Sequence, residues 1–310
     1  MQYVTVLSPA FSGSTLLSLM LTAHPRATGF GDTYFGPKND PKDLCTCGRS
    51  FLECEARLYV QDYVRRGGVK KFSWDVAAPV PRPKFWPIAK ERYWPITSSS
   101  TLSLIRRIPP SVRRAIFGTF YRENSLILQA LDELGDYDFY FDGSKFANRL
   151  ELLRTEIPDI KLIHLVRHPG AILYHDQRAN ISRVEYRMAQ WERYHRRARS
   201  FIALLGESSY LPVPYESVVQ RPEQFLNRVG HFLGIGDWPT DDPSVIDRSK
   251  VHIMGNAMRE SVERIVDYSN TWRQKLPANE VARADNKFLE KQWAIELYES
   301  WNCDLEMPAK

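Results

Sequence analysis

The stretch that decides the fold is Tyr3-Val4-Thr5-Val6-Leu7-Ser8-Pro9-Ala10-Phe11-Ser12-Gly13-Ser14-Thr15-Leu16-Leu17-Ser18-Leu19-Met20-Leu21. It opens with apolar and β-branched residues, which are typical of a buried strand in a parallel sheet. A short loop rich in Ser, Pro and Gly follows, and then Leu and Met recur at helical density. A strand, a small-residue loop and a helix N-terminus direct backbone N–H groups and a positive dipole at one point. The stretch therefore predicts a site for a phosphate-like anion.

The residues of this loop suit an oxyanion, but they are not those of a nucleoside triphosphatase. Gly13 lets the backbone approach the anion closely, and Ser12, Ser14 and Thr15 add hydroxyl donors. In the Walker A pattern, Ser14 would occupy the position of the Lys and Ser8 that of the first Gly. Because that Lys contacts the β- and γ-phosphates, its absence favours a nucleotide with fewer phosphates.

Length and composition predict a globular chain with one large α/β domain, or one domain with insertions. The 310 residues are 43% hydrophobic and 25% charged, and the net charge of +5 mildly favours an anionic ligand. This charge is too small and dispersed to predict nucleic-acid binding. No stretch approaches the roughly 18 apolar residues that span a bilayer, and no basic segment precedes the first apolar run. We therefore expect a cytoplasmic protein without a membrane span, whose oligomeric state the sequence does not indicate.

Strands and helices alternate along the rest of the chain. The predicted strands are residues 27–30, 138–141, 160–166 and 210–215, and the predicted helices are residues 123–134, 149–153, 183–205 and 222–233. Residues 38–58 are polar and are predicted to form a loop. The alternation predicts an α/β fold, a central parallel sheet with helices on both faces, in which ligands bind at the carboxyl ends of strands. Loops at Ser12, Asp142 and Arg167 are expected at such ends.

A segment from about residue 67 to 114 differs in composition, because it is rich in Pro, basic and aromatic residues. Within it, residues 84–88 (Lys-Phe-Trp-Pro-Ile) and 92–96 (Arg-Tyr-Trp-Pro-Ile) echo each other. The segment is either an insertion whose rings pack on the main body or a lid whose Trp rings contact the substrate. We predict a single domain over residues 1–310, with an insertion at about 60–120 as a candidate acceptor lid.

Three of the four cysteines cluster in the sequence, at Cys45, Cys47 and Cys54, whereas Cys303 is distant. The three can form a local disulfide, supply three zinc ligands with a distant fourth, or remain reduced thiols. Their spacing matches no common zinc pattern, and Cys45 and Cys47 are too close for a confident bridge. We assign them a local structural role and predict no metal.

Taken in order, these motifs resemble those of the sulfotransferases that use 3′-phosphoadenosine 5′-phosphosulfate (PAPS). Residues 12–17 are similar to the family's 5′-phosphosulfate loop, and residues 165–171 to its 3′-phosphate strand–turn–helix. Residues 215–234 resemble the family's "YEDL…P…FLG" stretch, and residues 252–259 and 267–273 resemble the C-terminal part of bacterial and carbohydrate-type members. The resemblance implies a P-loop-like sheet. It also implies sulfuryl transfer from PAPS to the hydroxyl of a small molecule or carbohydrate, without a metal.

The resemblance also implies which residues hold the donor. Arg167 would bind the 3′-phosphate, since a guanidinium can do so bidentately. Arg259 would be a second contact, with a solvated helix Arg as the alternative. At His175 the family usually has a Ser that binds this phosphate, and a His can donate the same hydrogen bond. The residues that would form the phosphosulfate loop are Ser12, Gly13, Ser14, Thr15 and Leu16.

The sequence departs from the family at Phe11, where a Lys or Arg usually contacts the bridging oxygen. Lys145 resembles the Lys of the family's "D-x-S-K" motif and is the candidate replacement, with a solvent-exposed Lys as the alternative. Asp32 corresponds to the carboxylate of the "G-E" motif in tyrosylprotein and some bacterial sulfotransferases. We expect Asp32 to be the general base for the acceptor hydroxyl, and its alternative role is a turn or helix-cap bond.

Two other functions remain open at this point. A small-molecule kinase on a P-loop scaffold would need Mg²⁺–ATP, which the missing Walker Lys disfavours. The third possible function is that of a non-catalytic nucleotide-binding protein related to such enzymes. Phe11 supports it, because this position lacks the usual cation.

Overall fold

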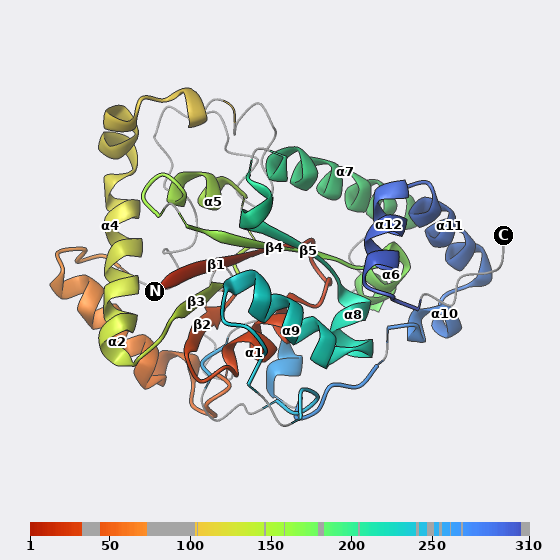
Figure 1. Ribbon diagram of the computed structural model, residues 1–310, viewed down its shortest axis with the longest axis horizontal. Helices are drawn as coiled ribbons and strands as arrows, with labels where there is room; N and C mark the ends of the chain where they lie inside the picture. The colour runs from red at the N-terminus through yellow and green to blue at the C-terminus, as the bar shows by residue number, and fades with distance from the viewer. Residues whose placement is uncertain are drawn as a thin grey trace. The chain divides into compact units, whose positions relative to one another are not determined.

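The chain forms a five-stranded sheet in the described part of a computed structural model, with the strand order β2-β3-β1-β4-β5 (Figure 1). The structure describes residues 1–32, 44–72, 103, 105–145, 147–157, 159–178, 183–203, 205–239, 242–246, 251–253, 256–260, 262–267 and 269–304. The strands are β1 (Gln2–Leu7), β2 (Ala27–Gly31), β3 (Phe139–Asp142), β4 (Lys161–Val166) and β5 (Tyr210–Pro214). The predicted α/β fold with helices around a parallel sheet is confirmed.

The chain divides into two compact units. The first unit comprises Met1–Leu7, Thr15–Leu162 and Ile246–Glu263, and the second comprises Ser8–Ser14, Ile163–Val245 and Arg264–Lys310. The single domain and its insertion stay a prediction, and about half of the candidate lid, residues 73–102, lies outside the described residues. Among the helices that the structure describes, none is both long and apolar enough to cross a membrane.

In the first unit, parallel pairing brings the carboxyl ends of neighbouring strands together. β1 pairs with β3 so that Thr5 lies opposite Asp142, and β2 pairs with β3 so that Gly31 also lies opposite Asp142. These ends carry the loops that hold Asp32 and Lys145. The helical elements of this unit are α1 (Ser14–Thr22), η1 (Phe51–Glu53), α2 (Glu55–Arg66), α4 (Pro110–Leu134), α5 (Ala147–Leu153) and η4 (Ala257–Glu260).

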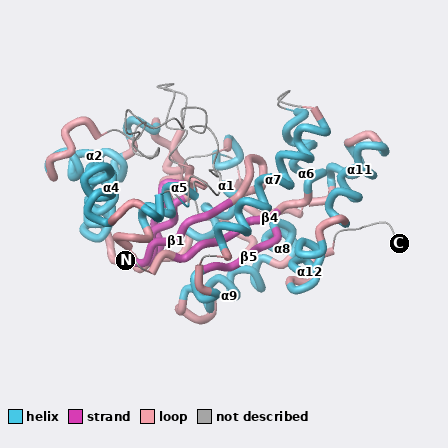
Figure 2. The backbone as a smooth tube through the Cα atoms, turned by 90° about the horizontal axis from the view of Figure 1, so that it is seen from above, coloured by secondary structure: helices cyan, strands magenta, loops and turns pink. Residues whose placement is uncertain are grey.

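Two helices of the first unit, α2 and α4, depart from the prediction. Helix α2 begins at Glu55, inside the segment predicted as a loop, and α4 begins at Pro110, well before the predicted start at Glu123. Neither has a side-chain hydrogen bond at its N-cap, although α4 has Pro110 in its first turn, which is a start signal. The two helices pack against each other, as Figures 1 and 2 show, so tertiary burial stabilises them.

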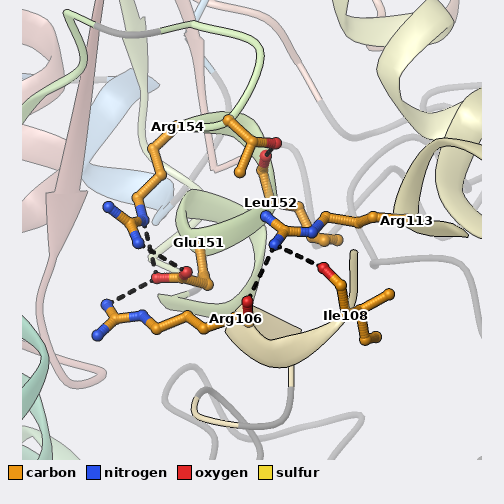
Figure 3. A network of polar contacts seen from close by, with 7 residues as sticks. Arg106, Ile108, Arg113, Glu151, Leu152 and Arg154 are labelled. Atoms are coloured by element: carbon orange, nitrogen blue, oxygen red, sulfur yellow. Dashed lines mark hydrogen bonds and ion pairs between the residues drawn. The ribbon is translucent and has the colours of Figure 1, made fainter. Parts of the chain in front are cut away.

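A buried carboxylate links α5 to the segment before α4 (Figure 3). The side chain of Glu151 is fully buried, and it accepts hydrogen bonds from Arg106 at 2.8 Å and from Arg154 at 3.0 Å. The guanidinium of Arg113 donates to the backbone carbonyls of Arg106 and Ile108 at 3.3 and 3.0 Å. Charged side chains therefore help to fix the entry to α4.

Replacing Glu151 with Gln is expected to lower the free energy of unfolding by about 1–3 kcal/mol, because the buried carboxylate charge that accepts hydrogen bonds from Arg106 and Arg154 is removed. The midpoint of urea denaturation measures this change. Glu156→Gln is the matched control, since its pair with Arg114 is largely exposed on the Arg side and should contribute little. Equal midpoints for the two variants would contradict the prediction.

In the second unit, helices pack around a core formed by α6, α7, α10 and α11. Its buried members include Leu173, Met188, Trp272 and Ala284. Figure 2 shows α6, α7 and α11 close together. The helical elements of this unit are α6 (Pro169–Arg178), α7 (Val184–Ile202), η3 (Glu207–Ser209), α8 (Tyr215–Gln220), α9 (Pro222–Leu233), α10 (Thr271–Lys275), α11 (Ala278–Leu289) and α12 (Gln292–Ser300).

Candidate active site

The loop between β1 and α1 is strained and contains an unpartnered hydroxyl. Phe11 has φ +65° and Gly13 has φ +89°. Glycine adopts this region freely, whereas a residue with a side chain is strained there. Ser12 is 1% exposed, and its hydroxyl has no hydrogen-bond partner among the described residues, while Ser14 is also buried. Strain together with a buried, unpaired hydroxyl is a feature of functional loops.

The ring of Tyr215, the first residue of α8, packs directly against this loop. A Cβ atom on Gly13 would lie 2.1 Å from Tyr215 Cε2, so only glycine fits. The guanidinium carbon of Arg167 lies 4.0 Å from the centroid of the same ring. Arg167 Nη1 also donates a hydrogen bond to the carbonyl of Phe11 at 2.9 Å. Gly13, Arg167 and Tyr215 therefore form one packed group, which we call the Tyr215 cluster.

Arg167 follows β4 directly and is 6% exposed, so it is not a surface arginine. Its backbone carbonyl accepts a hydrogen bond from Trp191 Nε1 at 3.0 Å, which anchors it to α7. Its Nε atom has no hydrogen-bond partner within the described ranges. The structure places a buried, oriented cation at the strand end where the sequence predicted one.

Glu216 braces the turn that follows Arg167. One carboxylate oxygen accepts from the hydroxyl of Tyr298 at 2.6 Å, and the other accepts from the backbone N–H of His168 at 3.2 Å. Burial raises the pKa of Glu216. Burial also lowers the pKa of His168 far below its ordinary value, so this ring is neutral where it stacks on Trp272. These contacts hold the β4–α6 turn in place.

His175 lies in the middle of α6 and is half-buried. Its ring centroid is 5.4 Å from that of Tyr174. This contact does not test the predicted interaction with a 3′-phosphate, which stays a prediction.

In the first unit, Asp32 and Lys145 form an ion pair. Lys145 Nζ lies 2.7 Å from Asp32 Oδ2, and the side chains are 15% and 8% exposed. The second carboxylate oxygen, Oδ1, is buried and has no hydrogen-bond partner in the described part of the chain. The pair therefore offers a cation and an available carboxylate oxygen at one point. The alternative reading of Lys145 as a solvated residue is wrong.

The loops that carry this pair are held together by backbone contacts. The N–H of Gly143 donates to the carbonyl of Gly31 at 3.1 Å. A Cβ on Gly143 would lie 2.8 Å from that same carbonyl, so a larger residue would push the two loops apart. Lys145 itself has φ +65°, a strained value for a residue with a side chain.

A buried polar network fixes the start of the Lys145 loop. Asp142 accepts from the backbone N–H of Ser144 at 2.9 Å, from Arg149 Nε at 2.7 Å and from the hydroxyl of Tyr3. Arg149 also donates to Asn124. The Arg149 charge and these hydrogen bonds lower the pKa of Asp142 against the effect of burial. The carboxylate thus stays ionised and the loop stays oriented.

Thr15, Leu16 and Arg259 also belong to the first unit. Thr15 Oγ1 accepts a hydrogen bond from the backbone N–H of Asn256 at 3.2 Å, and Leu16 is buried. Arg259 is 4% exposed and its Nε donates to the carbonyl of Leu44 at 3.0 Å. It is therefore not the solvated helix residue of the alternative reading.

A family model described as "Sulfotransferase family" matches residues 4–240. The chain belongs to the sulfotransferase family. The match includes β1, the loop at Gly13, Arg167 and the Tyr215 cluster as a whole. It confirms the resemblance found in the sequence, and with it an enzyme that transfers a sulfuryl group. Of the three functions left open by the sequence, this comparison supports the sulfotransferase.

A solved sulfotransferase domain shares the fold of this chain. The sulfotransferase domain of the olefin synthase from Synechococcus PCC 7002 aligns with a TM-score of 0.53 and 19% identity, over 98% of this chain and 95% of that one. The sulfotransferase domain from the curacin biosynthetic pathway has a TM-score of 0.48 and 14% identity, over 98% of both chains. A sulfotransferase from Mycobacterium avium has a TM-score of 0.44 and 15% identity, over 99% of this chain and 78% of that one. No curated protein sequence matches the chain significantly. The alignment with the olefin synthase domain, at 19% identity, shows the fold alone.

Tyr215 is the residue of the sulfotransferase whose role the sequence did not reveal. It was part of a motif, yet nothing in its neighbours indicated that its ring contacts Gly13 and Arg167. The available signal was the position of Tyr215 at the carboxyl end of a predicted strand, where side chains reach the ligand edge of a parallel sheet.

Proposed function

We propose that this sulfotransferase uses PAPS as the sulfuryl donor and a hydroxyl of a small molecule or carbohydrate as the acceptor. The observation that carries the proposal is the Tyr215 cluster, in which a glycine with positive φ and a buried arginine share one aromatic ring. A nucleotide with two separate anionic groups needs both a backbone cradle and a fixed cation.

The residues of the second unit fit such a donor. Ser12 has a buried hydroxyl, and Arg167 a buried Nε–H, that have no hydrogen-bond partner among the described residues. Gly13 lets the loop pack against the ring of Tyr215, because no Cβ is present. We infer that Ser12, Gly13 and Ser14 bind the 5′-phosphosulfate, with Thr15 and Leu16 at the start of α1. Arg167 binds the 3′-phosphate in this proposal.

PAPS supplies a singly charged sulfuryl group on a phosphosulfate, so no divalent cation is required to neutralise it. The chain must deprotonate the acceptor hydroxyl and stabilise charge on the leaving oxygen. We assign the first task to Asp32, whose Oδ1 is available to accept the proton. We assign the second to Lys145, whose ammonium group also orients Asp32 through its contact at 2.7 Å. Lys145 then takes the place of the cation that is missing at Phe11.

Arg259 and His175 complete the proposed set for the 3′-phosphate. Arg259 supports this assignment because it is buried and oriented by the carbonyl of Leu44. The free cysteines of the chain are compatible with the reducing cytoplasm that we propose as its location. The acceptor lid proposed at about residues 60–120 is supported by a composition rich in Pro, basic and aromatic residues.

The proposal is tested by thermal shift with 3′,5′-adenosine bisphosphate, Mg²⁺–ATP and AMP. A ligand that binds only the native state stabilises it by about 2.7 kcal/mol at a concentration 100 times its Kd. We expect stabilisation by the bisphosphate and a much smaller effect of the other two. Stabilisation by Mg²⁺–ATP without a response to the bisphosphate would overturn the proposal.

Arg167→Ala is expected to weaken binding of the bisphosphate by about 10- to 100-fold, the range for loss of hydrogen bonds to a charged group. Arg167→Lys keeps the charge but not the planar fork, so its affinity should fall between those of Arg167→Ala and wild type. The matched control is Arg283→Ala, since Arg283 is an exposed arginine of the same unit. Titration calorimetry measures all four proteins. Equal affinities for Arg167→Ala and Arg283→Ala would contradict the assignment.

A further inference from the structure

The cysteine motif of the first unit meets a histidine that is distant in the sequence. One ligand atom from each of Cys45, Cys47, Cys54 and His252 lies within 4.8 Å of the others. Cys54 Sγ is 3.3 Å from His252 Nδ1, and Cys45 Sγ is 3.9 Å from the same nitrogen. All the cysteines are free thiols in this structure. The four side chains therefore converge on one point.

We propose that Cys45, Cys47, Cys54 and His252 bind a structural zinc ion. Zinc takes Cys sulfur at about 2.3 Å and His nitrogen at about 2.0 Å in a tetrahedron, which places neighbouring ligand atoms about 3.5–3.8 Å apart. The two sulfur–nitrogen separations of 3.3 and 3.9 Å lie on either side of this range, and all four ligand atoms lie within 4.8 Å of one another. Three sulfurs and one nitrogen are soft ligands that select zinc over magnesium or calcium. Four protein ligands leave no open position, so the ion is structural and not catalytic. This inference revises the sequence-based prediction of no metal.

The backbone around the first two cysteines forms a tight turn. The N–H of Gly48 donates to the carbonyl of Cys45 at 2.9 Å, and the N–H of Cys45 donates to the carbonyl of Arg49 at 2.9 Å. Gly48 has φ +83°, a conformation that glycine adopts freely. The turn brings Cys45 and Cys47 to the same side, although only one residue separates them. Cys54 joins them from the N-cap position of α2.

Thr46 holds the histidine at this turn. Its hydroxyl donates to the carbonyl of Val251 and accepts from the N–H of Ile253 at 2.9 Å. These two residues flank His252, so a single side chain fixes the backbone on both sides of the proposed ligand. Positioning of ligands by neighbouring hydrogen bonds is typical of metal sites.

A buried cation lies beside the cluster. Arg57 is 1% exposed, stacks over the ring of Phe51 and lies within electrostatic range of all three cysteines. Zinc with three thiolates and a neutral histidine carries one net negative charge, since binding displaces the three thiol protons. The guanidinium of Arg57 offsets that charge in a buried position.

The proposed ion also stabilises the segment that carries Arg259. The carbonyl of Leu44, which precedes Cys45, accepts from Arg259 Nε at 3.0 Å. Losing the ion would remove one link between the turn and the histidine segment, which the hydrogen bonds of Thr46 also join. Loss of the ion is therefore expected to disturb Arg259 and weaken binding of the 3′-phosphate. This effect rests on the proposed function, whereas the metal content of the protein does not.

Metal analysis of the full-length protein, purified with a reducing agent and without chelators, tests the proposal directly. We expect about one zinc ion per chain in the wild type. Cys54→Ser and His252→Ala should lose at least 90% of it. Cys303→Ser is the matched control, because this half-buried cysteine belongs to the second unit, and it should retain full zinc content.

A second measurement keeps the test informative if the ligand variants do not fold. The wild type is stripped with a chelator and titrated with Zn²⁺ or Co²⁺. We expect a higher melting temperature with Zn²⁺ and thiolate-to-cobalt charge-transfer absorption with Co²⁺. Absence of zinc together with no response to either ion would overturn the proposal, as would a disulfide between two of the three cysteines. Binding of 3′,5′-adenosine bisphosphate by zinc-free protein would contradict only the link to Arg259.

Discussion

Replacing Gly13 with alanine is expected to weaken binding of 3′,5′-adenosine bisphosphate by about 100-fold or more, and to lower the free energy of unfolding by about 2–3 kcal/mol. The added Cβ would lie 2.1 Å from Cε2 and 2.2 Å from Cδ2 of Tyr215, and the backbone has φ +89°. The ring or the loop must move. Either movement disturbs the cradle and the ring on which Arg167 rests. Calorimetry measures the affinity, and urea denaturation measures the stability.

Gly118→Ala provides the matched control for this substitution. Gly118 lies inside α4, and a Cβ there meets nothing within 4 Å. Because alanine is the better helix former by about 1 kcal/mol, this variant should be stabilised with unchanged nucleotide affinity. Wild-type affinity in Gly13→Ala would contradict the assignment of the loop to the phosphosulfate.

A double variant separates the steric clash from the backbone strain at Gly13. Adding Tyr215→Ala to Gly13→Ala removes the ring that clashes but leaves the positive φ. We expect the double variant to lose less unfolding free energy than the two single variants lose together, because the two residues are in contact. Binding should stay weak, since Arg167 also loses the ring beneath it.

Features set by local sequence were predicted well. The strand before Arg167 is rich in Leu, Ile and Val, and it forms β4 close to the expected limits. The helix predicted over residues 222–233 is α9, Pro222–Leu233, which has proline in its first turn and Gly234 in a left-handed cap after its end. In these places hydrophobic periodicity, proline and glycine act within a few residues, so their effect is visible without tertiary structure.

Features set by distant pairs were not predictable from the sequence. Asp32 and Lys145 were each chosen as catalytic candidates, yet the sequence did not reveal that they contact each other. His252 follows Cys54 by almost 200 residues, so the spacing of the cysteines alone matched no zinc pattern. Such contacts depend on which strand ends and loops the fold brings together. Sequence motifs therefore identified several parts of the site without showing how those parts are joined.

Replacing Lys145 with alanine is expected to lower kcat by about 100- to 1,000-fold, the usual cost of removing one preorganised group that stabilises transition-state charge. Affinity for 3′,5′-adenosine bisphosphate should change little, because this product lacks the transferring group. The rate is measured as release of the bisphosphate from PAPS, with an acceptor that the wild type sulfates. Lys145→Arg keeps the charge and should recover part of the rate. An unchanged kcat in Lys145→Ala would contradict the assigned role.

The backbone at Lys145 allows loss of charge to be separated from loss of structure. Its φ of +65° costs a residue with a Cβ about 1 kcal/mol, and glycine escapes that cost. Lys145→Gly should therefore be more stable than Lys145→Ala by about that amount, while its kcat is equally low. If Lys145 had only a structural role, kcat would instead be higher in Lys145→Gly, the more stable of the two variants. If activity follows the ammonium group alone, the strain at this position is retained because it aims a charge at Asp32 and the reacting oxygen.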